Sequence, residues 1–160
     1  MDQEDATKVL HRISDTFQKN SVGVILYEPI GGHDAFGKMM IRNLAVSINL
    51  KIISDKVKIR GINLKTLSAY PTLQEESLRL KDSGFVSGQD AVDVNFAHNH
   101  WMGQEELSRI AKLELLDEME EWRLLASHYY IAWGWRTADA ANGKNGDVFE
   151  GWGQIKNTTV

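Results

Sequence analysis

The sequence has no cysteine, no excess of positive charge and no long apolar run, and each absence removes a class of function. Without cysteine, the chain forms neither a disulfide framework nor a thiolate nucleophile. Its 22 acidic residues outnumber 18 basic ones, and this net charge of −4 argues against broad electrostatic binding of nucleic acid or an anionic membrane. No stretch approaches the roughly 20 apolar residues of a membrane helix, and residues 1–8 lack the apolar core of a signal peptide. We therefore expect a cytoplasmic protein without a membrane partner.

Apolar spacing along the chain alternates between the period of a helix and that of a strand, which is typical of an α/β layer architecture. The continuous apolar run at 22–27 indicates a strand of a parallel sheet that helices cover on both faces. The 160 residues suit one domain. We expect helices at 5–18, from 34, at 72–81 and at 104–111, a short helix or loop at 96–101, and strands at 22–27, around 85–94 and at 128–135.

Capping signals mark two of these helices. Asp34 is placed as the N-cap of the second helix. The inward residues of that helix are then expected to be Phe36, Met39, Met40 and Leu44. Thr72 and Glu75 form the S/T-x-x-E capping box of the third helix, and Gly84 is expected to end it.

The stretch from Leu113 to Arg136 is the most informative part of the chain. In its first half, apolar residues at three-and-four spacing predict one buried helical stripe with acidic residues opposite. From His128 onward the residues are aromatic and β-favouring, which indicates a strand. The stripe consists of Leu115, Leu116, Met119, Trp122, Leu125 and Ala126. After this strand, polar and glycine-rich residues indicate a loose tail with Phe149 and Trp152 as anchors.

Three ordered motifs carry a family resemblance. Residues 108–129 read S-R-I-x-x-L-E-x-L-D-E-x-E-E-W-x-L-L-x-x-H-Y, and residues 26–37 read LYEPIGGHDAFG. Residues 70–93 begin YPTL, continue through GF and end AVD. Together these motifs resemble the leucine carboxyl methyltransferase family. The segments AWGWR at 132–136 and FEGW at 149–152 are most similar to fungal members.

The resemblance implies an α/β fold that is the C-terminal portion of a Rossmann-like S-adenosylmethionine-dependent methyltransferase, namely strands five, six and seven with their flanking helices. Residues 1–136 would form this partial domain, and 137–160 a polar, Gly/Asn-rich tail. In the usual strand order, three-two-one-four-five-seven-six, the three strands are neighbours, but the strand at 22–27 lacks strand four and keeps an open apolar edge. An atypical insert at about 46–59, expected on the surface, interrupts the resemblance. The tetrapeptide INLK occurs within the insert and again just after it, so a local duplication and an unspliced intron both explain it.

By resemblance, the activity is methyl transfer from S-adenosylmethionine to the C-terminal leucine α-carboxylate of the protein phosphatase 2A catalytic subunit. A carboxylate is already a nucleophile at neutral pH, so such a site needs positioning and desolvation more than a strong base. The family's cofactor motifs, a glycine turn after strand one and an acidic residue after strand two, are absent from this sequence. Gly31-Gly32 follows a later strand and is interpreted as a tight turn. We therefore expect no cofactor-binding residues here, and an incomplete, inactive fragment when the chain is alone.

Two other hypotheses stay open. A related wybutosine-synthesis methyltransferase acts on a carboxylate of a modified tRNA base, and the motifs at 70–73 and 120–122 suit it too. It is usually followed by kelch repeats, and none is present up to Val160. The other hypothesis is non-catalytic, a truncated gene model or a pseudoenzyme fragment that acts through contacts. Nucleic acid is an expected partner under the tRNA hypothesis alone.

Glu28 and Asp34 are the candidate substrate-side residues, because they follow the C-terminal end of a strand, where α/β folds place ligands. Turn and capping roles are the alternative, and no residue is assigned as catalytic. His98 and His100 lack a third ligand at a recognisable spacing, so no metal site is expected. His128 is interpreted as a core or strand-end histidine rather than a base.

Two further groups of residues are interpreted as structural. The acidic side chains between 114 and 121 are expected on a solvated helix face. The clustered aromatic residues are expected in the core, because no basic stripe interleaves them as it would in a nucleic-acid surface. These aromatic residues are Trp122, Tyr129, Tyr130, Trp133 and Trp135.

Overall fold

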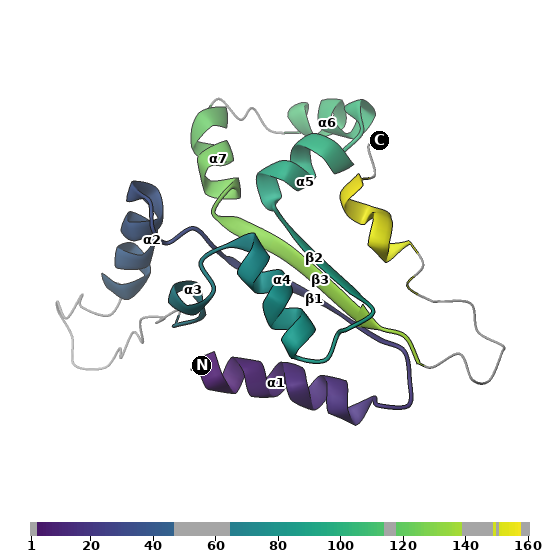
Figure 1. Cartoon of the computed structure of the whole chain (residues 1–160). Helices are drawn as coiled ribbons and strands as arrows, with labels where there is room; N and C mark the ends of the chain where they lie inside the picture. The colour runs from purple at the N-terminus through teal and green to yellow at the C-terminus, as the bar shows by residue number, and fades with distance from the viewer. Residues whose placement is uncertain (1–2, 47–64, 114–117, 139–148, 150, 158–160) are drawn as a thin grey trace, which may run out of the picture.

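The computed structural model describes residues 3–46, 65–113, 118–138, 149 and 151–157. Within them, helices and three strands alternate along the chain, as an α/β protein requires (Figure 1). The elements are α1 (Gln3–Thr16), β1 (Val22–Pro29), α2 (Ala35–Val46), α3 (Lys65–Ala69), α4 (Leu73–Asp82), β2 (Gly88–Asp93), α5 (Val94–Trp101), α6 (Gln104–Ala111), α7 (Met119–Ala126), β3 (Tyr129–Arg136) and the 3-10 helix η2 (Trp152–Asn157). None of the described helices is long and apolar enough to cross a membrane.

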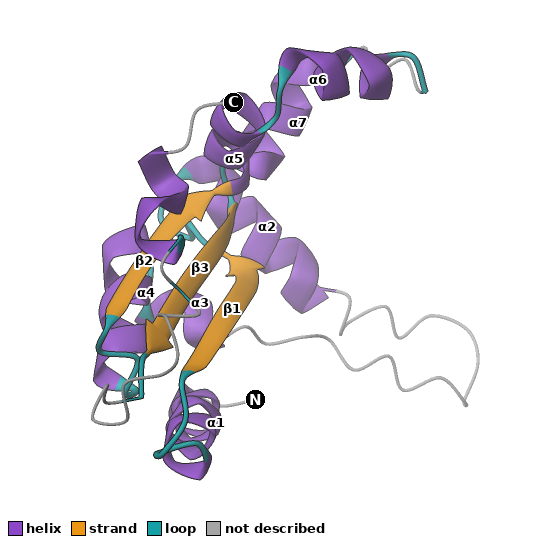
Figure 2. Cartoon of the chain, turned by 90° about the vertical axis from the view of Figure 1, so that its right-hand side faces the viewer, coloured by secondary structure: helices purple, strands orange, loops and turns teal. Residues whose placement is uncertain are grey.

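The three strands form one sheet in the order β1-β3-β2, with β3 in the middle (Figure 2). The central strand is antiparallel to both neighbours, and Ala132 lies opposite Leu26 on one side and Ala91 on the other. The predicted parallel pairing of the first strand is therefore wrong, although β1 and β2 run in the same direction. The order matches that expected for strands five, seven and six. Their numbering within a larger sheet stays a prediction.

One face of the sheet packs against α1 and α4 and holds the main core. Val22, Val24 and Leu26 of β1 point into it from the edge strand. Its buried members are Leu10, Ile30, Leu80, Phe85, Ala91, Tyr130 and Ala132. Because removing a leucine or phenylalanine side chain from water contributes about 1.5–3 kcal/mol, this cluster fixes α1 and α4 on the sheet.

A second, aromatic core lies on the opposite face, between β2, β3, α5 and η2. Trp133 and Trp135 are 3% and 9% exposed, which confirms the core interpretation for these two residues. The predicted anchors, Phe149 and Trp152, pack on this cluster, and the Trp133 Nε1 donates to the Trp152 carbonyl oxygen at 3.1 Å. The anchoring of the C-terminal segment is therefore confirmed, whereas residues 139–148 of the predicted loose tail lie outside the described residues.

The edge strand β1 is covered on one face only. Ile25 and Tyr27 are 62% and 63% exposed, so the predicted burial of this strand on both faces is wrong. The reason lies in the position of the second layer, because α5 and η2 pack mainly toward β2, at the other side of the sheet. On this face, Phe149 and Trp152 reach β1 at Gly23, where an added Cβ would meet their rings.

Local signals fixed several helix ends. The Thr72–Glu75 capping box is present at the start of α4, and Gly84 follows that helix with a φ of +100°. Asp34 caps α2 by accepting a hydrogen bond from the Gly37 N–H at 2.7 Å.

Some expectations for the helices are wrong, and others concern residues that the structure does not describe. Met39 is 49% exposed and Leu125 is 45% exposed, so the prediction that they face the core is wrong. Each of these short helices packs through a single row of side chains, and these two residues lie outside it. Helix α7 begins at Met119, and residues 114–117 of the predicted stripe lie outside the described residues. The insert predicted at 46–59 also lies outside them, except for Val46, which ends α2.

Candidate functional site

The candidate site lies at the end of the sheet where the C-termini of β1 and β2 meet the N-terminus of β3. The register places Glu28 and Asp93, the last acidic residues of two strands, both opposite Tyr130. Both predicted substrate-side residues lie at this end of the sheet, and each contacts a different basic residue. Asp34 contacts His128, and Glu28 contacts Arg79. This end of the sheet therefore holds two separate acid–base contacts rather than one joint pair of carboxylates.

The first pair joins the start of β3 to the start of α2. The His128 Nε2 lies 2.9 Å from Oδ2 and 3.0 Å from Oδ1 of Asp34. The other ring nitrogen, Nδ1, lies 2.8 Å from the Leu124 carbonyl oxygen. The ring also packs on Phe36, with centroids 4.6 Å apart. His128 is 4% exposed, which confirms its interpretation as a strand-end core histidine.

Both nitrogens of His128 therefore face oxygen atoms. A carbonyl oxygen can only accept a hydrogen bond, and so can an ionised carboxylate. A neutral imidazole has one N–H and would leave one of these contacts without a proton, whereas the imidazolium donates to both. These contacts of His128 with Asp34 and Leu124 hold the β1–α2 turn against the start of β3. This arrangement is structural, since both nitrogens are already engaged.

Stability in acid should depend on this pair. The Gly37 N–H and then His128 hold the pKa of Asp34 below its ordinary value of 3.8. A carboxyl with a lowered folded-state pKa contributes stability above its unfolded pKa, and that stability is lost as pH falls through the folded one. We expect Asp34→Asn, which can still cap the helix, to lower stability at pH 7 and to flatten the decline below about pH 4.

Urea unfolding from pH 7 down to pH 2.5 measures this effect. Asp15→Asn, an exposed change on α1, is the control and should keep the native pH profile. If the profile of Asp34→Asn ran parallel to that of the native chain, the carboxylate would have no role in acid stability.

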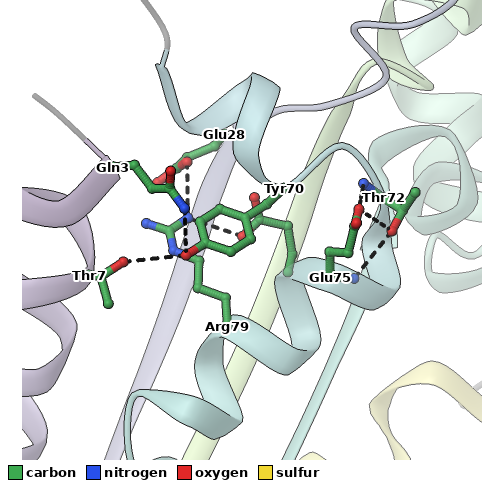
Figure 3. A network of polar contacts seen from close by, with 8 residues as sticks. Gln3, Thr7, Glu28, Tyr70, Thr72, Glu75 and Arg79 are labelled. Carbon is green, nitrogen blue, oxygen red and sulfur yellow. Dashed lines mark hydrogen bonds and ion pairs between the residues drawn. The ribbon is translucent and has the colours of Figure 1, made fainter.

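The second pair belongs to a buried cluster between β1 and α4 (Figure 3). Arg79 Nη1 lies 3.0 Å from Glu76 Oε2 and 3.4 Å from Glu28 Oε2. The side chains of Arg79 and Glu76 are each 2% exposed, and that of Glu28 is 29% exposed. Two carboxylates thus share one guanidinium, and the buried Glu76 in particular depends on Arg79 as its counter-charge.

The surroundings of the cluster tie three further elements together. The Arg79 guanidinium lies 5.0 Å from the centroid of the Tyr70 ring, a cation–π contact. Figure 3 shows Gln3 and Thr7 reaching from α1 to the Tyr70 hydroxyl, each at 3.4 Å. The end of β1 is therefore fixed to α4, to the residue after α3 and to α1 through polar contacts.

Burial sets the protonation of the acidic groups in this cluster. Desolvation raises the pKa of Glu76, although the Tyr130 hydroxyl and Arg79 oppose it. Desolvation, followed by the nearby Glu76 charge, also raises the pKa of Tyr130, which is fully buried. Tyr130 therefore stays neutral, and Arg79 favours the charged form of Glu76 against the cost of its burial.

The turn after β1 provides a test of whether the residues present fit a nucleoside cofactor such as S-adenosylmethionine. Gly31 has a φ of +79°, which confirms the predicted tight turn. A Cβ at Gly31 would touch the His128 ring, and one at Gly32 would touch Ile41. A Cβ at Gly37 would collide with the Gly31 carbonyl oxygen. Protein atoms fill the space beside these glycines, so the turn does not fit the donor.

The remaining sequence candidates take structural positions. Among the described residues, no group of three or more His, Cys, Asp or Glu side chains could hold a metal ion. His98 packs on Trp122, and His100 stacks on Phe96 with centroids 4.1 Å apart. Glu118, Glu120 and Glu121 are exposed, as predicted, whereas Glu114 and Asp117 lie outside the described residues. Tyr130 is in the core, and Tyr129 and Trp122 are half-buried.

Sequence reasoning did not identify Arg79 and Glu76 as members of the site. A signal was present, because Leu73, Glu76 and Leu80 follow the helical spacing of one stripe, and Arg79 lies three residues after Glu76. Charged residues on an apolar stripe are rarely buried unless they are paired. The partner of His128 carried no such signal, because Asp34 lies 94 residues away in the chain.

These features define a small α/β protein with a three-stranded antiparallel sheet, compatible with part of a methyltransferase domain. No protein-family model matches the chain. Leucine carboxyl methyltransferase 1 of Aspergillus fumigatus is 42% identical over 157 residues, which cover 97% of this chain and 35% of that protein. The protein of the same name from Emericella nidulans is 43% identical over 138 residues, 86% of this chain and 31% of its own length. The one from Schizosaccharomyces pombe is 36% identical over 131 residues, 82% of this chain and 37% of its own length.

The family recognised from the sequence is therefore confirmed: the chain is a relative of the leucine carboxyl methyltransferases. It spans about a third of the length of the curated relatives it matches. These three relatives are fungal, in agreement with the similarity to fungal members.

Proposed function

We propose that the chain forms part of a cytoplasmic enzyme that methylates the C-terminal leucine α-carboxylate of the protein phosphatase 2A catalytic subunit, with S-adenosylmethionine as donor. The supporting observation is its 42% identity, over 97% of its length, to leucine carboxyl methyltransferase 1 of Aspergillus fumigatus. Because the match covers 35% of that protein, we assign donor binding to residues outside this stretch. The chain alone is then inactive.

Glu28 and Asp34 remain the proposed substrate-side residues, with a limited role. Both are acceptors of hydrogen bonds, and a like-charged substrate carboxylate would be repelled by them. They suit the amide N–H groups of a bound peptide rather than its reacting end. Asp34 is better placed for this, because its side chain is 59% exposed while that of Glu28 is 29% exposed and shares Arg79. Neither acts as a nucleophile, since the substrate carboxylate already is one.

Calorimetry with S-adenosylmethionine tests whether donor binding belongs to residues outside this stretch. The 160-residue chain should give no binding heat, because its glycine turn is filled by His128 and Ile41. The Aspergillus fumigatus relative, measured in parallel, should bind the donor. Micromolar binding by the chain alone would contradict the assignment of donor binding to residues outside this stretch.

A chimera tests the activity itself. The matched stretch of the Aspergillus fumigatus relative is replaced by this chain, and transfer of a labelled methyl group to the phosphatase catalytic subunit is measured. We expect labelling that alkaline hydrolysis removes, as it does for a methyl ester, and none on a substrate with a C-terminal amide. A folded chimera that binds the donor but leaves the phosphatase unlabelled would contradict the proposed substrate.

A further inference from the structure

The face of the sheet opposite α1 and α4 has room for aromatic rings at one row of its register. Gly23 of β1 and Gly88 of β2 both lie opposite Trp135, so the central tryptophan has a glycine on each side. Residues directly opposite one another on neighbouring strands point to the same face. A Cβ at Gly88 would collide with the Trp135 ring, so this ring leans over β2. The space above Gly23 is therefore left for another group.

The C-terminal segment of the chain fills this space. A Cβ at Gly23 would lie 2.6 Å from the Phe149 ring and 3.0 Å from the Trp152 ring. These two rings meet edge to face, with centroids 4.7 Å apart, and the Trp152 ring centroid lies 6.2 Å from that of Trp135. The Trp133 Nε1 donates to the Trp152 carbonyl oxygen at 3.1 Å. These contacts hold η2, the yellow helix of Figure 1, beside β2.

The backbone of the segment is organised by its own hydrogen bonds. The Trp152 N–H donates to the Phe149 carbonyl oxygen at 2.8 Å, and the Gln154 N–H donates to the Gly151 carbonyl oxygen at 3.2 Å. Within the described residues the segment adds no strand to the sheet. The segment therefore meets the sheet through aromatic side chains set into a prepared surface, which is how short peptides are held by their anchor residues.

We infer that Gly23, Gly88, Trp133 and Trp135 form a peptide-binding site, which we call the aromatic site. Its ligand is a short segment that carries a phenylalanine and, three residues later, a tryptophan. Residues 149–155 supply this ligand within the same chain. A segment joined to its own site faces it at an effective concentration on the order of millimolar, so a free peptide of the same kind has to compete with it.

Peptide binding to a vacated site tests this inference. In the full chain, Phe149→Ser together with Trp152→Ser removes both rings and should move the NMR signal of the Trp133 indole N–H. A synthetic peptide of residues 147–157 should bind this double variant and return the signal towards its native position. It should bind the native chain at least about tenfold more weakly, because the tethered segment competes. The same peptide with alanine in both aromatic positions should bind neither protein.

Filling the aromatic site gives a second test that does not depend on the double variant. Gly23→Leu places an apolar side chain where the rings of Phe149 and Trp152 lie. It should displace the segment, move the Trp133 signal and prevent its recovery by the peptide. Gly151→Leu is the matched control, because Gly151 is exposed and no atom lies within 4 Å of an added Cβ there. This control should keep the native Trp133 signal.

The inference has clear points of failure. It would be overturned by a peptide that does not bind the double variant, or that binds it no better than the native chain. A double variant that does not fold would make the segment an inseparable part of the core instead of a ligand. If the native chain sedimented as a dimer that the double variant lacked, the ligand would come from a second copy. None of these measurements involves methyl transfer, so they stand apart from the proposed function.

Discussion

Replacing Arg79 by alanine is expected to lower the free energy of unfolding by about 3–5 kcal/mol, because it leaves a buried carboxylate without its cation. The side chains of Arg79 and Glu76 are each 2% exposed, and their charged atoms lie 3.0 Å apart. Glu28 shares the same guanidinium. Urea unfolding at pH 7 measures the loss.

The pH dependence of this variant has a defined sign. Burial already raises the pKa of Glu76, and loss of Arg79 removes one of the influences that lower it. A group whose folded-state pKa is raised binds its proton more tightly in the native state, so stability falls as pH rises through that pKa. Arg79→Ala should therefore lose less stability at pH 5 than at pH 7.

Two further variants separate the ion pair from simple loss of packing. The double variant Arg79→Met with Glu76→Leu should recover most of the stability, because apolar residues of similar size can replace a buried ion pair. Arg109→Ala breaks the Glu106 pair, whose side chains are 58% and 46% exposed, and should leave unfolding unchanged. If Arg79→Ala had as little effect as Arg109→Ala, the cluster would not stabilise the fold.

Features that depend on neighbouring residues were predictable from the sequence. The capping box at Thr72 and Glu75, the positive φ of Gly84 and the Asp34 cap all appear where the sequence placed them. They depend on contacts three or four residues apart or on one residue's backbone freedom. The aromatic strand that ends at Arg136 was predictable for the same reason.

The pairing of the site residues was not predictable in this way. Glu28 meets Arg79 across 51 residues, and Asp34 meets His128 across 94. Nothing in the local spacing of either residue selects such a partner. The packing of α4 on the sheet brings Arg79 to Glu28, and the pairing of β1 with β3 brings His128 to Asp34. Sequence reasoning therefore placed both carboxylates after the end of β1 and missed Arg79 and His128 as the residues they contact.

The exposed face of β1 shows another limit of pattern reasoning. An unbroken apolar run predicts burial on both faces, yet Ile25 and Tyr27 are open to solvent. The apolar run indicates that this strand is suited to burial on both faces, whereas the structure shows that β1 is covered on one face only. A strand suited to two layers but covered by one is expected when a chain matches about a third of its relatives.

Gly37→Ala is expected to destabilise the protein by about 2–3 kcal/mol, against the usual preference of helices for alanine. Gly37 lies in the first turn of α2, where alanine would ordinarily stabilise a helix by up to about 1 kcal/mol. Here, an added Cβ would collide with the Gly31 carbonyl oxygen and lie 2.9 Å from the Gly32 Cα. These are backbone atoms of a tight turn, so they cannot swing aside as the end of a side chain can.

The collision has a local consequence that distinguishes it from general loss of stability. The turn that must shift carries Asp34, and Gly31 itself packs against the His128 ring. The NMR signals of the His128 ring should therefore move in Gly37→Ala, while those of His98, on α5, should not. Gly151→Ala is the control, because no atom lies within 4 Å of its added Cβ. If Gly37→Ala were as stable as the native chain, the packing of α2 against the turn would be looser than the structure shows, and the glycine turn would have space that His128 and α2 now fill.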